Sequence, residues 1–134
     1  AAFLMLDPVI YARELMRKMD MHGASAWLVN TGWMGGAYGT GKRIDLPSTR
    51  RIINAILNKS ILNGEFNTIP VFNLNIPVKL EGFDSRLLDP RKAWASEEQW
   101  QRAATDLAIK FITNFSRISA DPEIEKLAAS GPQL

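Results

Sequence analysis

The chain has 134 residues, of which 46% are apolar and 22% charged, a composition typical of a folded globular protein rather than a disordered one. Its 16 basic and 14 acidic residues give a net charge of +2 and form no basic run, so the sequence offers little to a nucleic-acid backbone. The absence of cysteine excludes disulfides, a thiol nucleophile and thiolate metal sites, and no apolar run is long enough to span a membrane.

The first regular element predicted is a helix from Pro8 to about His22. Asp7 is a suitable N-cap, Pro8 suits the first helical position because it lacks an N–H, and Gly23 suits the C-terminal end. The apolar residues 1–6 are too short for a signal-peptide core, so we expect a buried strand or loop of a fold that begins upstream. His22 is the only histidine, and its place in the last helical turn favours a structural role over metal binding.

A strand, a glycine-rich loop and a second helix are predicted next. Residues 26–30 form a short continuous apolar run, which is typical of a buried strand. The loop covers residues 31–41, and Asp45 as N-cap with Pro47 in the first turn then predicts a helix. Its apolar stripe consists of Ile52, Ile53, Ile56 and Leu57. This order of helix, strand, loop and helix indicates an α/β fold.

The middle of the chain, residues 58–91, is irregular and rich in glycine and proline. Alternating residues between 68 and 80 predict one or two edge strands interrupted by proline. Asp89 and Arg91 flank Pro90 in a predicted turn, where a structural salt bridge or a turn cap is a better interpretation than catalysis.

The third predicted helix has the clearest pattern in the chain. Ser96 and Gln99 form a capping box at its start. Its apolar face is wide and aromatic, and it needs a large partner surface; the face consists of Trp100, Ala104, Leu107, Ala108, Phe111, Ile112 and Phe115. Asp121 and Pro122 then predict a last short helix that ends near Ala129.

The glycine loop is the stretch with the most chemistry. Five glycines in residues 31–41 leave backbone N–H groups able to face an anion, and Lys42 and Arg43 add positive charge. Gly36, Gly41 and Lys42 have the spacing of a P-loop, but Arg43 stands where Ser or Thr would hold magnesium. The predicted helix also starts too late, so we reject a P-loop. Two interpretations of the residue pattern remain open: a nucleotide-binding loop, or a connector with solvated charges.

Two adjacent motifs, WLVNTGW at 27–33 and GGAYGTGKRI at 35–44, resemble the C-terminal nucleotide-side loop of ATP-dependent phosphoenolpyruvate carboxykinases. The resemblance extends over essentially the whole chain. It continues through Thr49-Arg50, residues 52–57, PVFNLNIP at 70–77, LDPR at 88–91, the helix at 111–115 and the tail AASGPQL at 128–134. The match of the tail leads us to expect that residue 134 is the C-terminus.

The resemblance implies a fold of two α/β domains with a cleft between them. Residues 1–134 would be the C-terminal part of the nucleotide-binding domain, incomplete at its N-terminal side, with helices packed on a partial sheet. The family converts oxaloacetate and ATP to phosphoenolpyruvate, CO2 and ADP in gluconeogenesis. It uses Mg2+ with ATP and a second divalent metal, usually Mn2+. The phosphate-binding loop, the metal ligands and the oxaloacetate-binding arginines would all lie upstream of this segment.

The resemblance assigns three nucleotide-binding residues to the segment. Arg43 corresponds to the family arginine lying against the adenine ring, where a guanidinium can stack. Ile44 corresponds to a neighbour that gives backbone and apolar contact, and Thr49 to a hydroxyl near the adenine edge. Met34 departs from the small polar residue of many relatives but leaves these three positions intact. No catalytic and no metal-binding residue is expected in the segment.

Two hypotheses about function follow. The chain is either part of a carboxy-lyase that uses ATP, inactive when alone, or a stand-alone nucleotide-binding or structural remnant of that family. The first implies as partners ATP, oxaloacetate and the rest of the carboxykinase chain, with no nucleic acid, no membrane and a cytoplasmic location. Trp33 and Tyr38 either pack beneath the nucleotide or anchor the loop.

Overall fold

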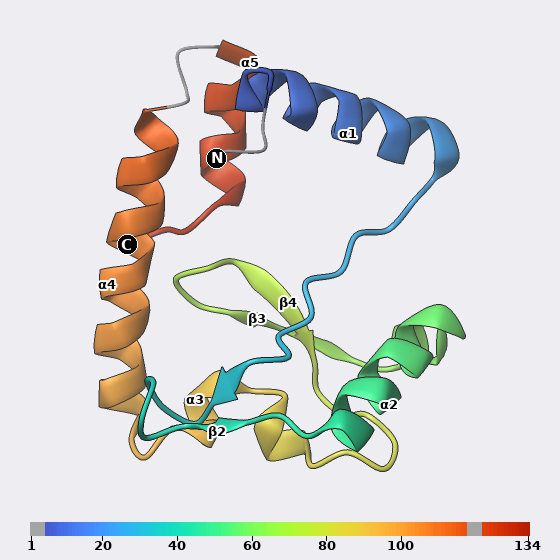
Figure 1. The fold of residues 1–134 in the computed structure, drawn as a ribbon, viewed down its shortest axis with the longest axis vertical. Coiled ribbons are helices and arrows are strands. Elements are labelled where there is room, and N and C mark those ends of the chain that lie inside the picture. Colours follow the sequence, from blue (N-terminus) through green and yellow to red (C-terminus); the bar gives the residue numbers. More distant parts are fainter. Residues whose placement is uncertain (1–4, 118–121) are drawn as a thin grey trace.

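The computed structural model of the chain describes residues 5–117 and 122–134 (Figure 1). Within these ranges, the α-helices are α1 (Pro8–His22), α2 (Leu46–Leu57), α3 (Pro90–Ala93), α4 (Glu97–Ser116) and α5 (Pro122–Glu125). The strands are β1 (Trp33–Met34), β2 (Lys42–Arg43), β3 (Phe66–Ile69) and β4 (Leu74–Pro77). Short 3₁₀ helices cover Ser60–Asn63, Ser85–Leu87 and Lys126–Ser130. The fold therefore mixes helices with small sheets, which is consistent with the α/β class.

Helix α1 has the ends that the sequence predicts. The carboxylate of Asp7 accepts a hydrogen bond from the N–H of Val9 at 2.8 Å. Gly23 ends the helix with φ +57°, and the N–H of Ala24 donates to the carbonyl of Met19 at 3.0 Å. Glycine adopts this left-handed conformation at little cost, so both predicted caps are confirmed.

The predicted strand at residues 26–30 is wrong. Residues 24–30 form an extended connection without strand pairing, which runs from α1 to β1 (Figure 1), and Leu28 is 87% exposed. An apolar run becomes a buried strand only when neighbouring strands satisfy its backbone groups, and the described residues provide no such neighbour to this segment. Trp27 alone packs onto a core, the one formed by Ala55, Ile61 and Leu80.

The partial sheet consists of two separate antiparallel pairs, β1–β2 and β3–β4. In the second pair Phe66 lies opposite Pro77 and Ile69 opposite Leu74. The prediction of one or two strands between residues 68 and 80 is therefore confirmed as two, although β3 starts two residues earlier. Val71 and Asn73 in the connecting turn have φ of 73° and 53°, which is rare for a β-branched residue such as valine.

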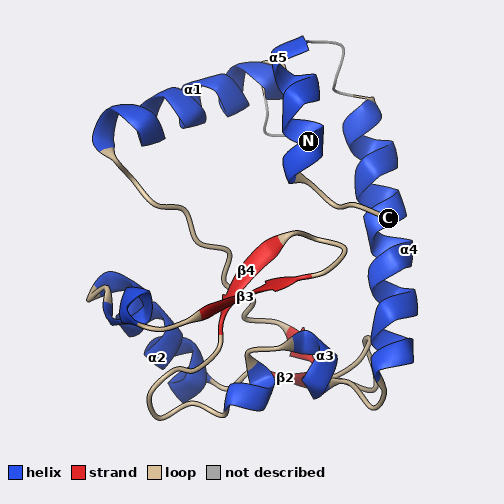
Figure 2. Ribbon diagram, turned by 180° about the vertical axis from the view of Figure 1, so that it is seen from behind, coloured by secondary structure: helices blue, strands red, loops and turns tan. Residues whose placement is uncertain are grey.

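Helix α4 packs against this hairpin on one side (Figure 2). The N–H of Gln99 donates to Oγ of Ser96 at 3.2 Å, which confirms the Ser96 half of the predicted capping box. The core here joins Ile69 to Trp100 and Ala104. Phe111 meets Phe72 edge to face at 6.5 Å but remains 53% exposed. The chain itself therefore covers only part of the wide apolar face predicted for this helix.

The predicted last helix is divided in two. Helix α5 is a single turn, and the 3₁₀ helix Lys126–Ser130 continues it to Gly131. The predicted start at Asp121 lies outside the described residues.

The molecule is open. Helix α1 contributes no buried residue and crosses one end of the molecule away from the β3–β4 hairpin (Figures 1 and 2). The accessible surface is 10214 Å2. A folded monomer of 15.0 kDa is expected to expose about 7,000 Å2. The chain therefore carries roughly 3,000 Å2 of surface beyond that of a closed domain.

Candidate functional site

The site predicted from the glycine loop is built on the hairpin β1–β2. Trp33 lies opposite Arg43 and Met34 opposite Lys42. The N–H of Ile44 donates to the carbonyl of Gly32 at 3.0 Å, which extends the pairing by one bond. Directly opposed residues of two antiparallel strands point to the same face, so Trp33 and Arg43 share one face of the hairpin.

The turn that joins the two strands is closed by its own backbone. The carbonyl of Ala37 accepts hydrogen bonds from the N–H groups of Thr40 and Gly41, at 3.1 and 2.9 Å. It also accepts one from the Thr40 hydroxyl at 3.0 Å. These two N–H groups are thus engaged within the turn instead of facing a ligand, which is unlike a phosphate-binding loop.

The aromatic residues of the turn contact each other. The rings of Trp33 and Tyr38 meet edge to face, with centroids 5.3 Å apart and an interplanar angle of 83°. Such contacts stabilise a pair by about 0.5–1.5 kcal/mol beyond the area they bury. Trp33 is 47% exposed and Tyr38 86% exposed, so the pair braces the turn at the surface. Their anchoring role has a structural basis, and contact with a nucleotide stays a prediction.

Asn30 fixes the entry to the hairpin, a role that the sequence pattern did not reveal. Its side-chain oxygen accepts a hydrogen bond from the N–H of Gly32 at 2.8 Å. Its side-chain nitrogen donates to the carbonyl of Trp33 at 3.2 Å. Asparagine commonly bonds to the backbone two residues ahead, and this tendency was the available signal.

Two of the glycines are required by close contacts. A Cβ on Gly35, whose φ is +74°, would come within 2.8 Å of the carbonyl oxygen of Ala93 in α3. A Cβ on Gly41 would come within 2.7 Å of the carbonyl oxygens of both Met34 and Gly36. Gly39 also has a positive φ of +92°, but a Cβ there would meet nothing within 4 Å.

The three predicted nucleotide residues extend in sequence from the end of the hairpin into the first turn of helix α2. Arg43 is exposed at the end of β2, and Ile44 directly after it is half-buried. Thr49 is half-buried in the first turn of α2, and its hydroxyl donates to the carbonyl of Asp45 at 3.1 Å. Arg43 and Ile44 are adjacent, and Thr49 follows one helical turn after the cap.

Helix α2 begins as the sequence predicts. The Asp45 carboxylate accepts hydrogen bonds from the N–H of Ser48 at 2.7 Å and from its hydroxyl at 3.0 Å. The hydrogen bond from the Ser48 N–H is the main reason that the pKa of Asp45 is held below its usual value. Because the helix starts at Leu46, Lys42 lies in a strand and not at a helix N-terminus. The rejection of a P-loop is therefore confirmed.

The pair Asp89–Arg91 is structural, as predicted. Asp89 is buried and caps α3: its carboxylate accepts a hydrogen bond from the N–H of Arg91 at 3.0 Å. The same carboxylate lies 2.9 Å from the Arg91 guanidinium. The hydrogen bonds from that guanidinium are the main reason that the pKa of Asp89 lies below its usual value.

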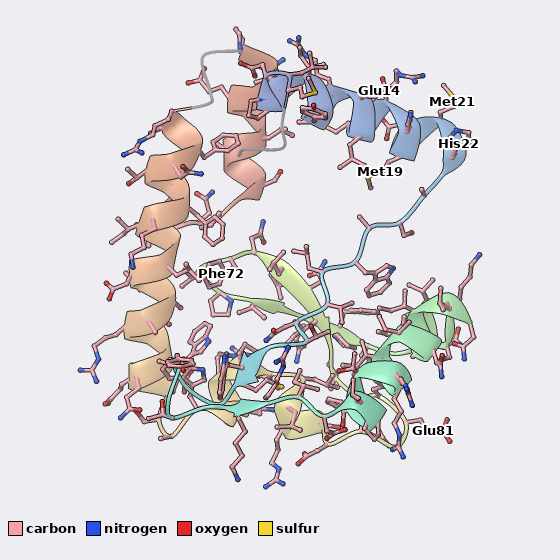
Figure 3. The ribbon with its side chains drawn as sticks, viewed as in Figure 1. Glu14, Met19, Met21, His22, Phe72 and Glu81 are labelled. Atoms are coloured by element: carbon pink, nitrogen blue, oxygen red, sulfur yellow. The ribbon has the colours of Figure 1, made fainter. Side chains whose placement is uncertain are left out.

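The described residues contain no cluster of three or more His, Asp or Glu side chains able to hold a metal ion. His22 is exposed at the end of α1, beside Met21 (Figure 3). In the part of the chain that the structure covers, no helix is both long and apolar enough to cross a bilayer.

Two surface hollows are lined by residues outside the hairpin β1–β2. One is shallow and lies at the start of α4, lined by Ser96, Glu97, Glu98, Gln101 and Arg102. Its two carboxylates would repel the phosphates of a nucleotide, so we do not consider it an ATP site. A second hollow lies between β3–β4 and α3, and neither one includes Arg43, Ile44 or Thr49.

Comparison with protein families gives a match to the model of the phosphoenolpyruvate carboxykinase family, ATP-dependent type, over residues 1–86. The matched part is well over half of the 134 residues. It contains α1, the hairpin β1–β2, α2 and the hairpin β3–β4. The chain therefore belongs to the ATP-dependent phosphoenolpyruvate carboxykinase family, as a segment of such an enzyme.

Proposed function

We propose that the chain supplies the adenine side of the ATP site in a complete carboxykinase. That enzyme converts oxaloacetate and ATP to phosphoenolpyruvate, CO2 and ADP, a step of gluconeogenesis in the cytoplasm. Residues 1–134 are then the C-terminal part of its nucleotide-binding domain. The segment alone is inactive because catalysis depends on residues outside it.

The observation that carries this proposal is the placement of Arg43. Its side chain is exposed on a hairpin braced by Asn30 and by the Trp33–Tyr38 contact, and it is adjacent to Ile44. A guanidinium held at the surface by a stiff backbone suits stacking on a flat purine ring. Thr49, in the first turn of α2, would contribute its hydroxyl at the edge of the same ring.

The large exposed surface supports the rest of the carboxykinase as the partner of this segment. An excess of roughly 3,000 Å2 is within the range buried in permanent interfaces. Apolar residues of α1 and α4 contribute to it, among them Ile10, Leu15, Leu107 and Phe111. A stand-alone remnant would leave these faces in water.

The metals of the family are assigned to the remainder of the enzyme. Mg2+ and Mn2+ are held mainly by converging oxygen and imidazole ligands, and the described residues contain no group of three or more His, Asp or Glu side chains able to hold one. In this proposal the segment binds and orients the base.

The test is Arg43→Ala in the complete enzyme, with Lys42→Ala as the matched control. The two residues are adjacent in β2, so their side chains point to opposite faces while their charges are equal. Loss of a cation–π contact of about 0.5–2 kcal/mol should raise KM for ATP roughly 2- to 30-fold and leave KM for oxaloacetate unchanged. The proposal fails if Arg43→Ala leaves KM for ATP unchanged, or raises it no more than Lys42→Ala does.

A further inference from the structure

The hairpin that carries Arg43 touches α3 at one point where no side chain fits. Figures 1 and 2 both show α3 beside β2. At Gly35 an added Cβ would lie 2.8 Å from the carbonyl oxygen of Ala93 and 3.7 Å from its carbonyl carbon. Both atoms are backbone, so relief of the clash would require one of the two segments to move.

The Ala93 carbonyl is itself held in place. The N–H groups of Lys92 and Ala93 donate to the carbonyl of Asp89, at 3.0 and 3.2 Å. The buried carboxylate of Asp89 caps the same turn and is tied to the Arg91 guanidinium. Helix α3 also packs against the start of α4. The atom that faces Gly35 therefore belongs to a fixed turn.

The contact can be transmitted to Arg43 because the hairpin is stiff. Gly35 follows Met34, which is paired with Lys42, and Lys42 precedes Arg43. The two strands approach so closely that a Cβ on Gly41 would collide with the Met34 carbonyl. A displacement at Gly35 is therefore expected to shift the paired strands together with the turn.

We propose that Gly35 is a positioning residue for nucleotide binding: its close approach to Ala93 seats the hairpin on α3 and thereby sets where the Arg43 guanidinium meets the adenine ring. This inference rests on the proposed function of Arg43. Gly35 itself need not touch the nucleotide, because it acts through the hairpin.

The test compares Gly35→Ala with Gly39→Ala in the complete enzyme. Both glycines have positive φ, so both substitutions add similar backbone strain, but only position 35 gains a steric clash. A displacement of about 1 Å in a binding group can reduce activity by up to about 100-fold. We expect Gly35→Ala to raise KM for ATP by no more than Arg43→Ala does, up to about 30-fold, with KM for oxaloacetate within about 2-fold. Gly39→Ala should stay within about 3-fold for both substrates.

A second pair of variants, Gly35→Asn and Gly39→Asn, controls for the possibility that the alanine variants misfold. Asparagine tolerates the left-handed region better than alanine but still has a Cβ, so the clash is kept while the strain falls. The same difference between positions 35 and 39 is expected. If both position 35 variants are insoluble while both position 39 variants are soluble, the contact serves folding and the inference is overturned.

A double variant separates this inference from the proposed function. If Gly35 acts through Arg43, then Gly35→Ala in an Arg43→Ala background should add less than about 2-fold to KM for ATP. Equal effects of Gly35→Ala in both backgrounds would overturn the inference. If Arg43→Ala raises KM for ATP but Gly35→Ala and Gly39→Ala have the same KM for ATP, the inference about Gly35 fails and the proposed function stands. If Arg43→Ala itself changes nothing, the proposed function fails first.

Discussion

Asp89 and Arg91 are joined by two side-chain hydrogen bonds of 2.9 Å, and the N–H of Arg91 donates to the same carboxylate at 3.0 Å. Asp84 and Arg86 repeat the arrangement five residues earlier, with an ion-pair distance of 2.7 Å. The two pairs differ in burial. The side chains of Arg91 and Asp89 are 27% and 9% exposed, whereas those of Arg86 and Asp84 are 79% and 41% exposed. The chain thus contains one motif in two solvent environments.

We predict that Asp89→Asn destabilises the protein more than Asp84→Asn. Removing a charge from a largely buried pair leaves the remaining charge poorly compensated, at a cost of about 1–3 kcal/mol. An exposed pair contributes little, because water and salt screen its charges. Thermal unfolding of the two variants in the complete enzyme measures the difference. Equal melting temperatures would show that the burial of Asp89 has no energetic consequence.

We predict that Asp45→Ala weakens the start of α2, whereas Asp45→Asn does not. Alanine removes the side-chain acceptor for the Ser48 N–H, and loss of an N-cap typically costs about 1 kcal/mol. Asparagine has a side chain of the same length and retains an oxygen that can accept this hydrogen bond. Melting temperatures of the two variants provide the measurement, with Asp45→Asn as the control. An equal decrease in melting temperature for both variants would show that the charge of Asp45, and not its hydrogen bond, stabilises the helix.

We predict that Glu14 titrates far below an ordinary glutamate. Arg17 donates two hydrogen bonds to its carboxylate, at 2.7 and 2.9 Å, and lowers its pKa from 4.5 to about 2. Because the folded pKa is lowered, the stabilising effect is complete above pH 4.5 and is lost as the pH falls towards 2. The effect is small and sensitive to salt, since both groups are half exposed.

The carboxyl 13C shift of Glu14, followed between about pH 1.5 and 6, measures this titration. Arg17→Gln should raise the midpoint towards the ordinary value. Lys18→Gln should change it less, because the Lys18 amine is 3.6 Å away instead of 2.7 Å. A midpoint near 4.5 in the unmodified protein would contradict the prediction.

Local features of this fold could be predicted from the sequence. Asp7, Asp45 and Ser96 each bond to a backbone N–H two or three residues ahead, so the neighbouring sequence is sufficient to define the cap. The helix end at Gly23 was predictable for the same reason, because a left-handed glycine after a helix is recognised from the neighbouring sequence alone.

The features that the sequence did not predict correctly depend on contacts between segments far apart in the chain. Residues 26–30 have the composition of a buried strand, but strand formation depends on partners that composition does not specify. The contact of Gly35 with Ala93 joins segments far apart in the chain, so the sequence shows a glycine but not its reason. Arg43, Ile44 and Thr49 came from resemblance to a family; the glycine pattern alone left open a nucleotide-binding loop or a connector with solvated charges.

The register that places Trp33 opposite Arg43 also has an optical consequence. Of the four tryptophans, all within described residues, Trp33 is the most exposed at 47%, while Trp100 is 5% exposed and Trp27 and Trp94 are intermediate. A small quencher dissolved in water reaches Trp33 first, so its indole dominates the quenchable fluorescence. The protein therefore carries its own spectroscopic probe on the hairpin face that presents Arg43, and shielding of that face can be followed without a label.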